Sequence, residues 1–283
     1  MFDIVIIGAG IVGLAIARSI AEKTDKSVLV IEKEKSFGRG ISSRNSEVIH
    51  SGIYYEPESL KAKYCSRGRD MTYVFCNQHN IWVNRCGKIV MGKSHQTNDL
   101  ESLHKNAQKN GVPDIRLLEP KEINVLEPNI EADIGLQVGC TGIVSAHDLM
   151  AAFYKISQEG DHDYLFKSKV VGADSKSDGY EISIENAQGE LEKVSTEWVI
   201  NAAGLESDMV AQMLGGDYPT LRYSKGCYYK LSSKWRGAFN PLVYPLPDKK
   251  HGSLGIHLSF AESQMVKLGP SAHWIPGRTE DYD

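Results

Sequence analysis

Residues 2–33, FDIVIIGAGIVGLAIARSIAEKTDKSVLVIEK, decide the fold of this chain. The run Ile4–Ile7 predicts a buried parallel strand, and the glycines Gly8, Gly10 and Gly13 follow it where a helix should begin. In such a turn the first glycine allows the bend and the second leaves room for a pyrophosphate. The third lets the helix pack closely on the strand, and the N–H groups at the helix start bind the phosphates. The stretch therefore predicts a dinucleotide site.

An acidic residue narrows the choice of dinucleotide. A second apolar strand, Val28–Ile31, ends in Glu32, nineteen residues beyond Gly13. A carboxylate at this position accepts hydrogen bonds from ribose hydroxyls and repels a 2′-phosphate. A glycine-rich turn in an ordinary strand–helix–strand unit would explain the glycines but not Glu32. The pattern thus favours FAD or NAD over NADP.

Composition excludes several other classes of protein. The 283 residues are enough for two lobes, and 41% hydrophobic with 24% charged residues is typical of a soluble globular protein. A net charge of −4 provides no positive field for nucleic acid, so we expect no nucleic-acid partner.

The cysteines and the N-terminus indicate a cytoplasmic protein. Five cysteines are scattered without CxxC spacing, which argues against a disulfide framework and against a metal site. Asp3 stands where an export signal carries positive charge, and the uncharged stretch Ile4–Ala17 is too short to span a bilayer. We expect no transmembrane segment, and peripheral attachment at the inner membrane stays open.

The order of the remaining elements points to FAD. An ordinary NAD-binding domain would continue with strand–helix units after Glu32, whereas here a different lobe is inserted and a β-meander returns the chain to the sheet. The strand after the meander ends in Ala202-Ala203-Gly204, which lets the backbone approach a bound cofactor. We expect helices over 59–80, 97–110 and 146–157, after Pro120 and from about Ser207, and strands at 82–83, 88–91, 169–173, 180–185, 191–195 and 198–201.

The chain resembles the FAD-dependent oxidoreductases of the D-amino-acid oxidase superfamily, and most of all the L-2-hydroxyglutarate dehydrogenase/oxidase family. The segments that carry the resemblance are, in order, GAGIVGLAIA, IEKE, SSRNSEVIHSGIYYEPESLKAKYC, CGKIV, GIVSAHDL, NAAGLESD, YPLPD, LGIHL and LGPSA. The resemblance implies an α/β fold with a Rossmann-like FAD-binding domain (1–80 and 145–215). An interleaved α+β substrate domain on a mixed sheet would comprise 81–144 and 216–283.

The resemblance also implies which residues bind the cofactor. Ser42, Ser43, Arg44 and Asn45 would line the FAD phosphates and the flavin ring, and Val170 would meet the adenine end through its backbone. The candidate cofactor residues are Gly8, Gly10, Ile11, Val12, Gly13, Glu32, Lys33, Ser42, Ser43, Arg44, Asn45, Ser46, Val170, Ala202, Ala203 and Gly204.

The implied reaction is oxidation of a small L-2-hydroxy acid, with L-2-hydroxyglutarate the leading substrate, to the 2-oxo acid by hydride transfer to flavin N5. His50 would lie near the isoalloxazine, and His257 and Tyr244 would face the substrate. A histidine suits the task of taking the hydroxyl proton because its pKa lies near neutrality. Substrate carboxylates need cations or hydroxyls, for which Lys225 is the main candidate. Tyr228 and Arg85 are also available, and Cys227 is assigned no role.

Several alternatives stay open. The family's usual Thr-Gly-His-Asn is replaced here by Ser43-Arg44-Asn45, which leaves the exact substrate open. An amine- or amino-acid-oxidising relative is the first alternative. The family continues past Asp283, so a C-terminally truncated chain is expected. It would be a non-catalytic FAD-binding remnant, or half of a split enzyme that needs a complementing C-terminal chain. The electron acceptor would be oxygen, a quinone or a flavoprotein.

Overall fold

The computed structural model describes residues 1–247 and 255–278, which form two compact units. The first unit comprises residues 1–45 and 146–223, and the second comprises 46–145 and the chain from 224 onward. The division expected from the sequence put residues 46–80 in the first unit and residues 216–223 in the second. In the structure, residues 46–80 group with the second unit, where Tyr73 donates to the Cys140 carbonyl and Val48 pairs with Ile143. Residues 216–223 group with the first unit, where the Tyr223 hydroxyl donates to the Leu205 carbonyl.

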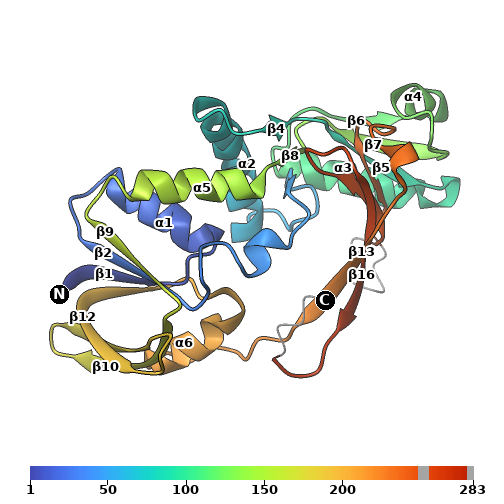
Figure 1. The fold of residues 1–283 in the computed structure, drawn as a ribbon. Helices are drawn as coiled ribbons and strands as arrows, with labels where there is room; N and C mark the ends of the chain where they lie inside the picture. Colours follow the sequence, from blue (N-terminus) through green and yellow to red (C-terminus); the bar gives the residue numbers. More distant parts are fainter. Residues whose placement is uncertain (248–254, 279–283) are drawn as a thin grey trace. The chain divides into compact units, whose positions relative to one another are not determined.

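A six-stranded sheet forms the centre of the first unit (Figure 1), with the order β10-β11-β12-β1-β2-β9. Strands β12, β1, β2 and β9 are parallel, and β10 and β11 extend the sheet as an antiparallel meander. The strands are β1 (Phe2–Ile7), β2 (Val28–Glu32), β9 (His162–Phe166), β10 (Lys169–Lys176), β11 (Gly179–Glu185) and β12 (Leu191–Asn201). The helical segments are α1 (Ile11–Ala21), η1 (Ile41–Ser43), α5 (Ala146–Ser157), η3 (Gly204–Glu206) and α6 (Ser207–Met213).

Alternation along the buried strands gives this sheet two apolar faces. Val5 and Ile7 of β1 share a core with Val210 of α6, whereas Ile6 between them is equally buried and faces the other way. Helices α1 and α5 lie side by side (Figure 1). The sheet is therefore covered on both sides, as a parallel sheet requires.

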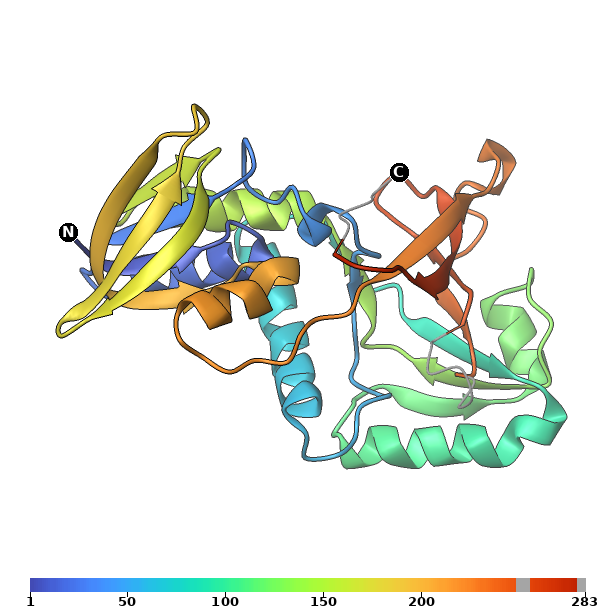
Figure 2. The same ribbon diagram turned by 90° about the horizontal axis from the view of Figure 1, so that it is seen from below.

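A seven-stranded mixed sheet dominates the second unit (Figure 2), with the order β13-β16-β15-β14-β5-β7-β6. The pair β14 and β5 is parallel, and the other pairs are antiparallel. The strands are β5 (Lys88–Gly92), β6 (Ile115–Leu118), β7 (Ile134–Val138), β13 (Ser224–Lys230), β14 (Leu242–Pro245), β15 (His257–Phe260) and β16 (Val266–Trp274). A small sheet combines β3 (Val48–Ile49), β8 (Gly142–Val144) and β4 (Val83–Asn84). The helical segments are α2 (Leu60–Gln78), η2 (Ser94–Gln96), α3 (Thr97–Lys109), α4 (Pro120–Leu126) and η4 (Ser233–Trp235).

The predicted α/β class with a mixed sheet is confirmed. In the second unit, most strands of the seven-stranded sheet were not predicted, and in the first unit two strands differ from the prediction. The segments expected at 191–195 and 198–201 form one strand, β12, because it pairs antiparallel with β11 up to Thr196 and parallel with β1 from Thr196 onward. Strand β9 was not predicted. It lies at the sheet edge beside β2, and its polar residues His162 and Asp163 weaken the apolar signal of a strand.

Candidate cofactor and substrate sites

Close backbone contacts within the glycine turn explain why two of its residues are glycines. Gly8 has φ +106°, and a Cβ on it would lie 2.5 Å from the Ala202 carbonyl oxygen at the end of β12. A Cβ on Gly13 would lie 2.0 Å from the Gly8 carbonyl oxygen. A Cβ atom essentially never lies this close to a non-bonded atom, so no side chain fits at either position without moving the backbone. One closely packed region, called the corner below, thus contains the glycine turn, the start of helix α1 and Ala202.

The N-terminus of α1 fits an anionic group. Gly10 is the N-cap residue and supplies no side-chain cap, and Val12 in the first turn is 60% exposed. The first N–H groups of a helix have no partner within the helix. The Ser42 hydroxyl accepts from the Ile11 amide at 3.0 Å and lies 3.1 Å from where a Cβ on Gly10 would be. Backbone donors and a side-chain-free approach are what a dinucleotide diphosphate needs.

Glu32 holds the turn from the neighbouring strand. Its Oε2 accepts from the Ala9 amide at 2.7 Å, and its Oε1 accepts from the Glu34 amide at 2.9 Å. A carboxylate offers about four lone-pair sites, so these two bonds leave capacity for ribose hydroxyls. The neighbouring Lys33 pairs with Glu206 at 3.3 Å.

The loop after β2 is closed by its own side chains. Arg44 donates to the Arg39 carbonyl, the Ser43 hydroxyl to the Gly40 carbonyl at 3.2 Å, and Asn45 to the Ser42 carbonyl at 2.7 Å. These bonds give the loop a defined shape beside Ser42. Ser46 begins the second unit.

The remaining cofactor candidates lie in the first unit. Val170 is buried in the core that contains Ile31, at an irregular register of β10. The Ala203 amide donates to the Asn201 side chain at 3.2 Å, and Gly204 has φ +58°. The structure therefore brings the glycine turn, Glu32, Ser42 and Ala202 together within one unit.

The second unit contains the candidate substrate residues. The rings of Tyr244 and His257 stack with centroids 3.9 Å apart and planes 13° from parallel, and Tyr228 meets His257 edge-on at 6.4 Å. His257 is 5% exposed, and its Nδ1 lies 3.1 Å from the Gly255 carbonyl oxygen. A carbonyl can only accept, so Nδ1 carries the proton and Nε2 is the basic nitrogen of the neutral ring. Burial lowers the pKa of His257, which keeps the ring neutral near pH 7.

Lys88 is a further candidate residue, which the sequence did not reveal. The side chain is 1% exposed, and its Nζ lies 4.6 Å from the ring centre of Tyr54 and 4.7 Å from that of Tyr244. Burial lowers the pKa of Lys88 to about 7. The only signal in the sequence is a lysine at the start of an apolar strand, and such a lysine usually lies at the surface.

His50 belongs to the same group of side chains. Burial, together with the charges of Lys88 and His257, lowers the pKa of His50 to about 4. The Cys65 thiol donates to the His50 carbonyl at 3.3 Å. His50, Tyr54, Lys88, Tyr244 and His257 are called the polar cluster below.

The other candidate donors lie outside the polar cluster. Lys225 is on β13 opposite His273, three residues before Tyr228. The exposed Arg85 forms an ion pair with Asp114 and donates to the Gly139 carbonyl at 3.3 Å. Cys227 pairs with Ser271 between β13 and β16. No group of three or more metal-ligating side chains occurs within residues 1–247 and 255–278.

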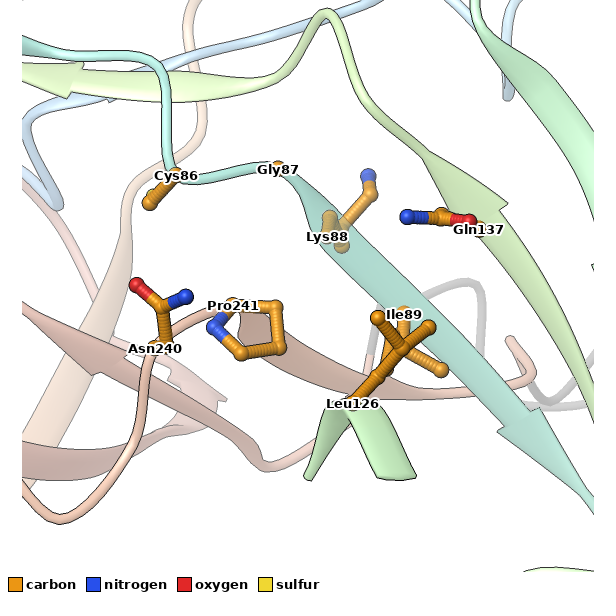
Figure 3. A pocket seen from close by; sticks show the side chains of 8 residues that line it. All are labelled: Cys86, Gly87, Lys88, Ile89, Leu126, Gln137, Asn240 and Pro241. Carbon is orange, nitrogen blue, oxygen red and sulfur yellow. The ribbon is translucent and has the colours of Figure 1, made fainter. Parts of the chain in front are cut away.

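A pocket of about 120 Å³ in the second unit is a separate feature (Figure 3). Adjacent strand residues point to opposite faces, so Ile89 points toward this pocket while the Lys88 ammonium points away from it, toward Tyr54 and Tyr244. The residues at the pocket are Cys86, Gly87, Lys88, Ile89, Leu126, Gln137, Asn240 and Pro241. No histidine lines it, so we do not place the reaction there.

Comparison with known proteins defines the class. Residues 3–283 match the family of FAD dependent oxidoreductases, and the chain belongs to that family. The predicted cofactor, FAD, is the cofactor of this family. No helix among the described residues is both long and apolar enough to cross a membrane.

Individual relatives narrow the comparison further. The chain is 36% identical over 283 residues to the mitochondrial L-2-hydroxyglutarate dehydrogenase of Bos taurus, with 96% of this chain and 61% of that protein covered. It is 33% identical over 275 residues to the L-2-hydroxyglutarate dehydrogenase of Escherichia coli K12, with 96% and 64% covered. The chain thus spans less than two thirds of the length of these relatives.

Solved structures share the fold. L-alpha-glycerophosphate oxidase from Mycoplasma pneumoniae, dithionite-reduced and with FAD bound, matches with a TM-score of 0.87 at 23% identity, covering 98% of this chain and 73% of that one. Glycine oxidase from Geobacillus kaustophilus matches with a TM-score of 0.82 at 18% identity, covering 96% and 72%. These likenesses establish the fold of the chain and nothing finer.

Proposed function

We propose that this protein carries out the FAD-dependent oxidation of an L-2-hydroxy acid to the 2-oxo acid, with L-2-hydroxyglutarate as the leading substrate. The observation that carries the proposal is the orientation of His257. Its Nδ1 is engaged by the Gly255 carbonyl, and its buried Nε2 has no hydrogen-bond partner within the described part of the chain. A neutral imidazole held in this way is suited to take a proton from a hydroxyl group.

The chemistry divides between cofactor and protein. Oxidation removes a hydride from the carbon that carries the hydroxyl and a proton from the hydroxyl itself. FAD, when bound, supplies the hydride acceptor. His257 accepts the proton at Nε2, and Tyr244 keeps the imidazole plane fixed by stacking on it. Positioned proton acceptors of this kind contribute about 10²–10⁴-fold to the rate.

The partners and the compartment are part of the proposal. An acceptor must take the electrons from FAD, and it is oxygen, a quinone or a flavoprotein. All five cysteines are free thiols, which supports a reducing compartment such as the cytoplasm.

An anaerobic titration tests the proposed function. The FAD-loaded chain is mixed without oxygen with L-2-hydroxyglutarate, its D-enantiomer, glycine or sarcosine, and the absorption band of oxidised flavin is followed. We expect bleaching with the L-2-hydroxy acid. Bleaching by an amine alone would reassign the substrate, and a bound flavin that no compound bleaches would refute oxidation by this chain alone.

A further inference from the structure

Lys88 is a buried cation that has no carboxylate counter-ion among the residues that the structure describes. The titratable groups that face it are His50, Tyr54, Cys65, Cys140, Tyr244 and His257, and none of them is a carboxylate. Its Nζ has no hydrogen-bond partner among residues 1–247 and 255–278. The faces of two tyrosine rings attract a cation, but they do not replace its hydrogen bonds with water. An ammonium buried in this way indicates that a bound ligand supplies the missing hydrogen-bond acceptors.

Other polar atoms of the cluster share this property. The hydroxyl groups of Tyr54 and Tyr244 and the Nε2 of His257 are also buried without a hydrogen-bond partner in the described ranges. Folded proteins leave few buried polar groups unsatisfied, so four in one cluster indicate a missing binding partner. An ammonium and two hydroxyls can donate together, and they therefore match an acceptor with negative charge.

We propose that Lys88, together with the hydroxyls of Tyr54 and Tyr244, binds a carboxylate group of the substrate. The inference rests on the proposed function, since a 2-hydroxy acid carries such a group. One ammonium balances one carboxylate, whereas a phosphate would bring more charge than this cluster neutralises. Lys88 replaces Lys225 as the leading substrate cation because it lies against Tyr244, which stacks on His257.

The binding experiment uses a matched pair of ligands. Pentanoate and pentanamide have similar size and shape and differ in charge, and neither has a hydroxyl to oxidise. Calorimetry on the FAD-loaded chain should show that pentanoate binds and pentanamide does not. Lys88→Met should weaken pentanoate binding by about 10- to 100-fold, as expected for loss of a charge-assisted hydrogen bond. Lys230→Met, which removes an exposed lysine of the same sheet, should leave it unchanged.

Proton uptake separates a ligand contact from a structural role. Burial lowers the pKa of Lys88 to about 7, and a bound carboxylate favours the charged ammonium. Above that pH, pentanoate binding should therefore take up a proton, which calorimetry in two buffers of different ionisation enthalpy measures. Lys88→Arg should keep binding but lose this uptake, because arginine is already charged. This variant also decides the question if Lys88→Met fails to fold.

The outcomes distinguish this inference from the proposed function. Equal pentanoate affinity in the wild type and Lys88→Met, or proton uptake that persists in Lys88→Arg, would overturn the role of Lys88 even if L-2-hydroxyglutarate bleaches the flavin. Conversely, Lys88-dependent pentanoate binding without any bleaching would support the carboxylate site and refute the oxidation.

Discussion

The Glu32 carboxylate accepts a hydrogen bond of 2.7 Å from the backbone amide of Ala9, inside the glycine turn. The same carboxylate accepts from the Glu34 amide through its other oxygen. Glu32 therefore shapes the turn before any ribose binds to it. A role in the turn and a role toward the cofactor are compatible, because both need an ionised acceptor at the end of β2.

Replacing Glu32 should weaken the turn and FAD binding together. Glu32→Ala leaves the Ala9 amide without its acceptor, which costs about 1–3 kcal/mol, and Glu32→Gln should cost less because it keeps one acceptor oxygen. Thermal unfolding and FAD titration by fluorescence measure the two effects. Glu22→Ala, which removes a surface pair with Arg18, should change stability by about 0.5 kcal/mol or less. Full FAD affinity in Glu32→Ala would contradict this assignment.

Two helical glycines should respond in opposite ways to alanine. Gly13→Ala places a methyl group 2.0 Å from the Gly8 carbonyl oxygen, so the corner must open and FAD retention should be lost. Gly68 in α2 has no atom within 4 Å of an added Cβ, so Gly68→Ala should stabilise the protein by about 0.5–1 kcal/mol. Flavin content after purification and the thermal midpoint report both results. A yellow Gly13→Ala protein would count against the corner as the FAD site.

The glycine turn was predictable from the sequence because it depends mainly on residues that are close together in the chain. Gly8, Gly10 and Gly13 lie within six residues. Gly8 and Gly13 are required by contacts with the backbone nearby or with Ala202, and a Cβ on Gly10 would meet the Ser42 hydroxyl. The second strand ends in Glu32, as the apolar run Val28–Ile31 and the spacing from Gly13 predict. The resemblance to relatives added Ser42, whose bond to the Ile11 amide spans residues too far apart for a sequence pattern to show.

The polar cluster was only partly predictable because it depends on contacts between distant strands. His257 and Tyr244 were expected, but Lys88 reaches them through the parallel pairing of β5 with β14, which brings together residues more than 150 positions apart. Pairing between strands that are so far apart in the sequence produces no periodic pattern of residues that would predict it. The length of β12 was missed for a similar reason, since two different partners hold its two halves.

Replacing His257 should separate cofactor binding from turnover. His257→Asn removes the proton acceptor in the second unit and leaves the glycine turn intact, so the flavin should be retained. The rate of anaerobic flavin reduction by L-2-hydroxyglutarate should fall by about 10²–10⁴-fold. His95→Asn, at an exposed position in η2, serves as the control. An unchanged reduction rate in His257→Asn would remove His257 from the reaction.

The polar cluster should make stability depend on pH. The pKa of His50 is lowered from 6.5 to about 4, and that of Lys88 from 10.5 to about 7. Between about pH 4 and 6.5 for His50, and between about pH 7 and 10.5 for Lys88, the unfolded chain binds more protons than the folded one. The free energy of unfolding should therefore rise with pH in both ranges, by at most about 1.4 kcal/mol per pH unit for each group. Lys88→Met should be more stable than the wild type near pH 7.

This gain from Lys88→Met should shrink as the pH rises through 10.5, above which lysine is neutral in both states of the wild type. Urea unfolding at several pH values measures the difference between the two proteins, and taking the difference removes the common contribution of Tyr54, Cys65 and Tyr244. The burial-raised pKa values of these three groups act in the opposite direction at high pH. Parallel stability curves for the wild type and Lys88→Met would show that Lys88 keeps an ordinary pKa. His50→Gln should flatten the wild-type curve only between about pH 4 and 6.5, and His257, whose pKa burial also lowers, accounts for part of the slope that remains just below pH 6.5.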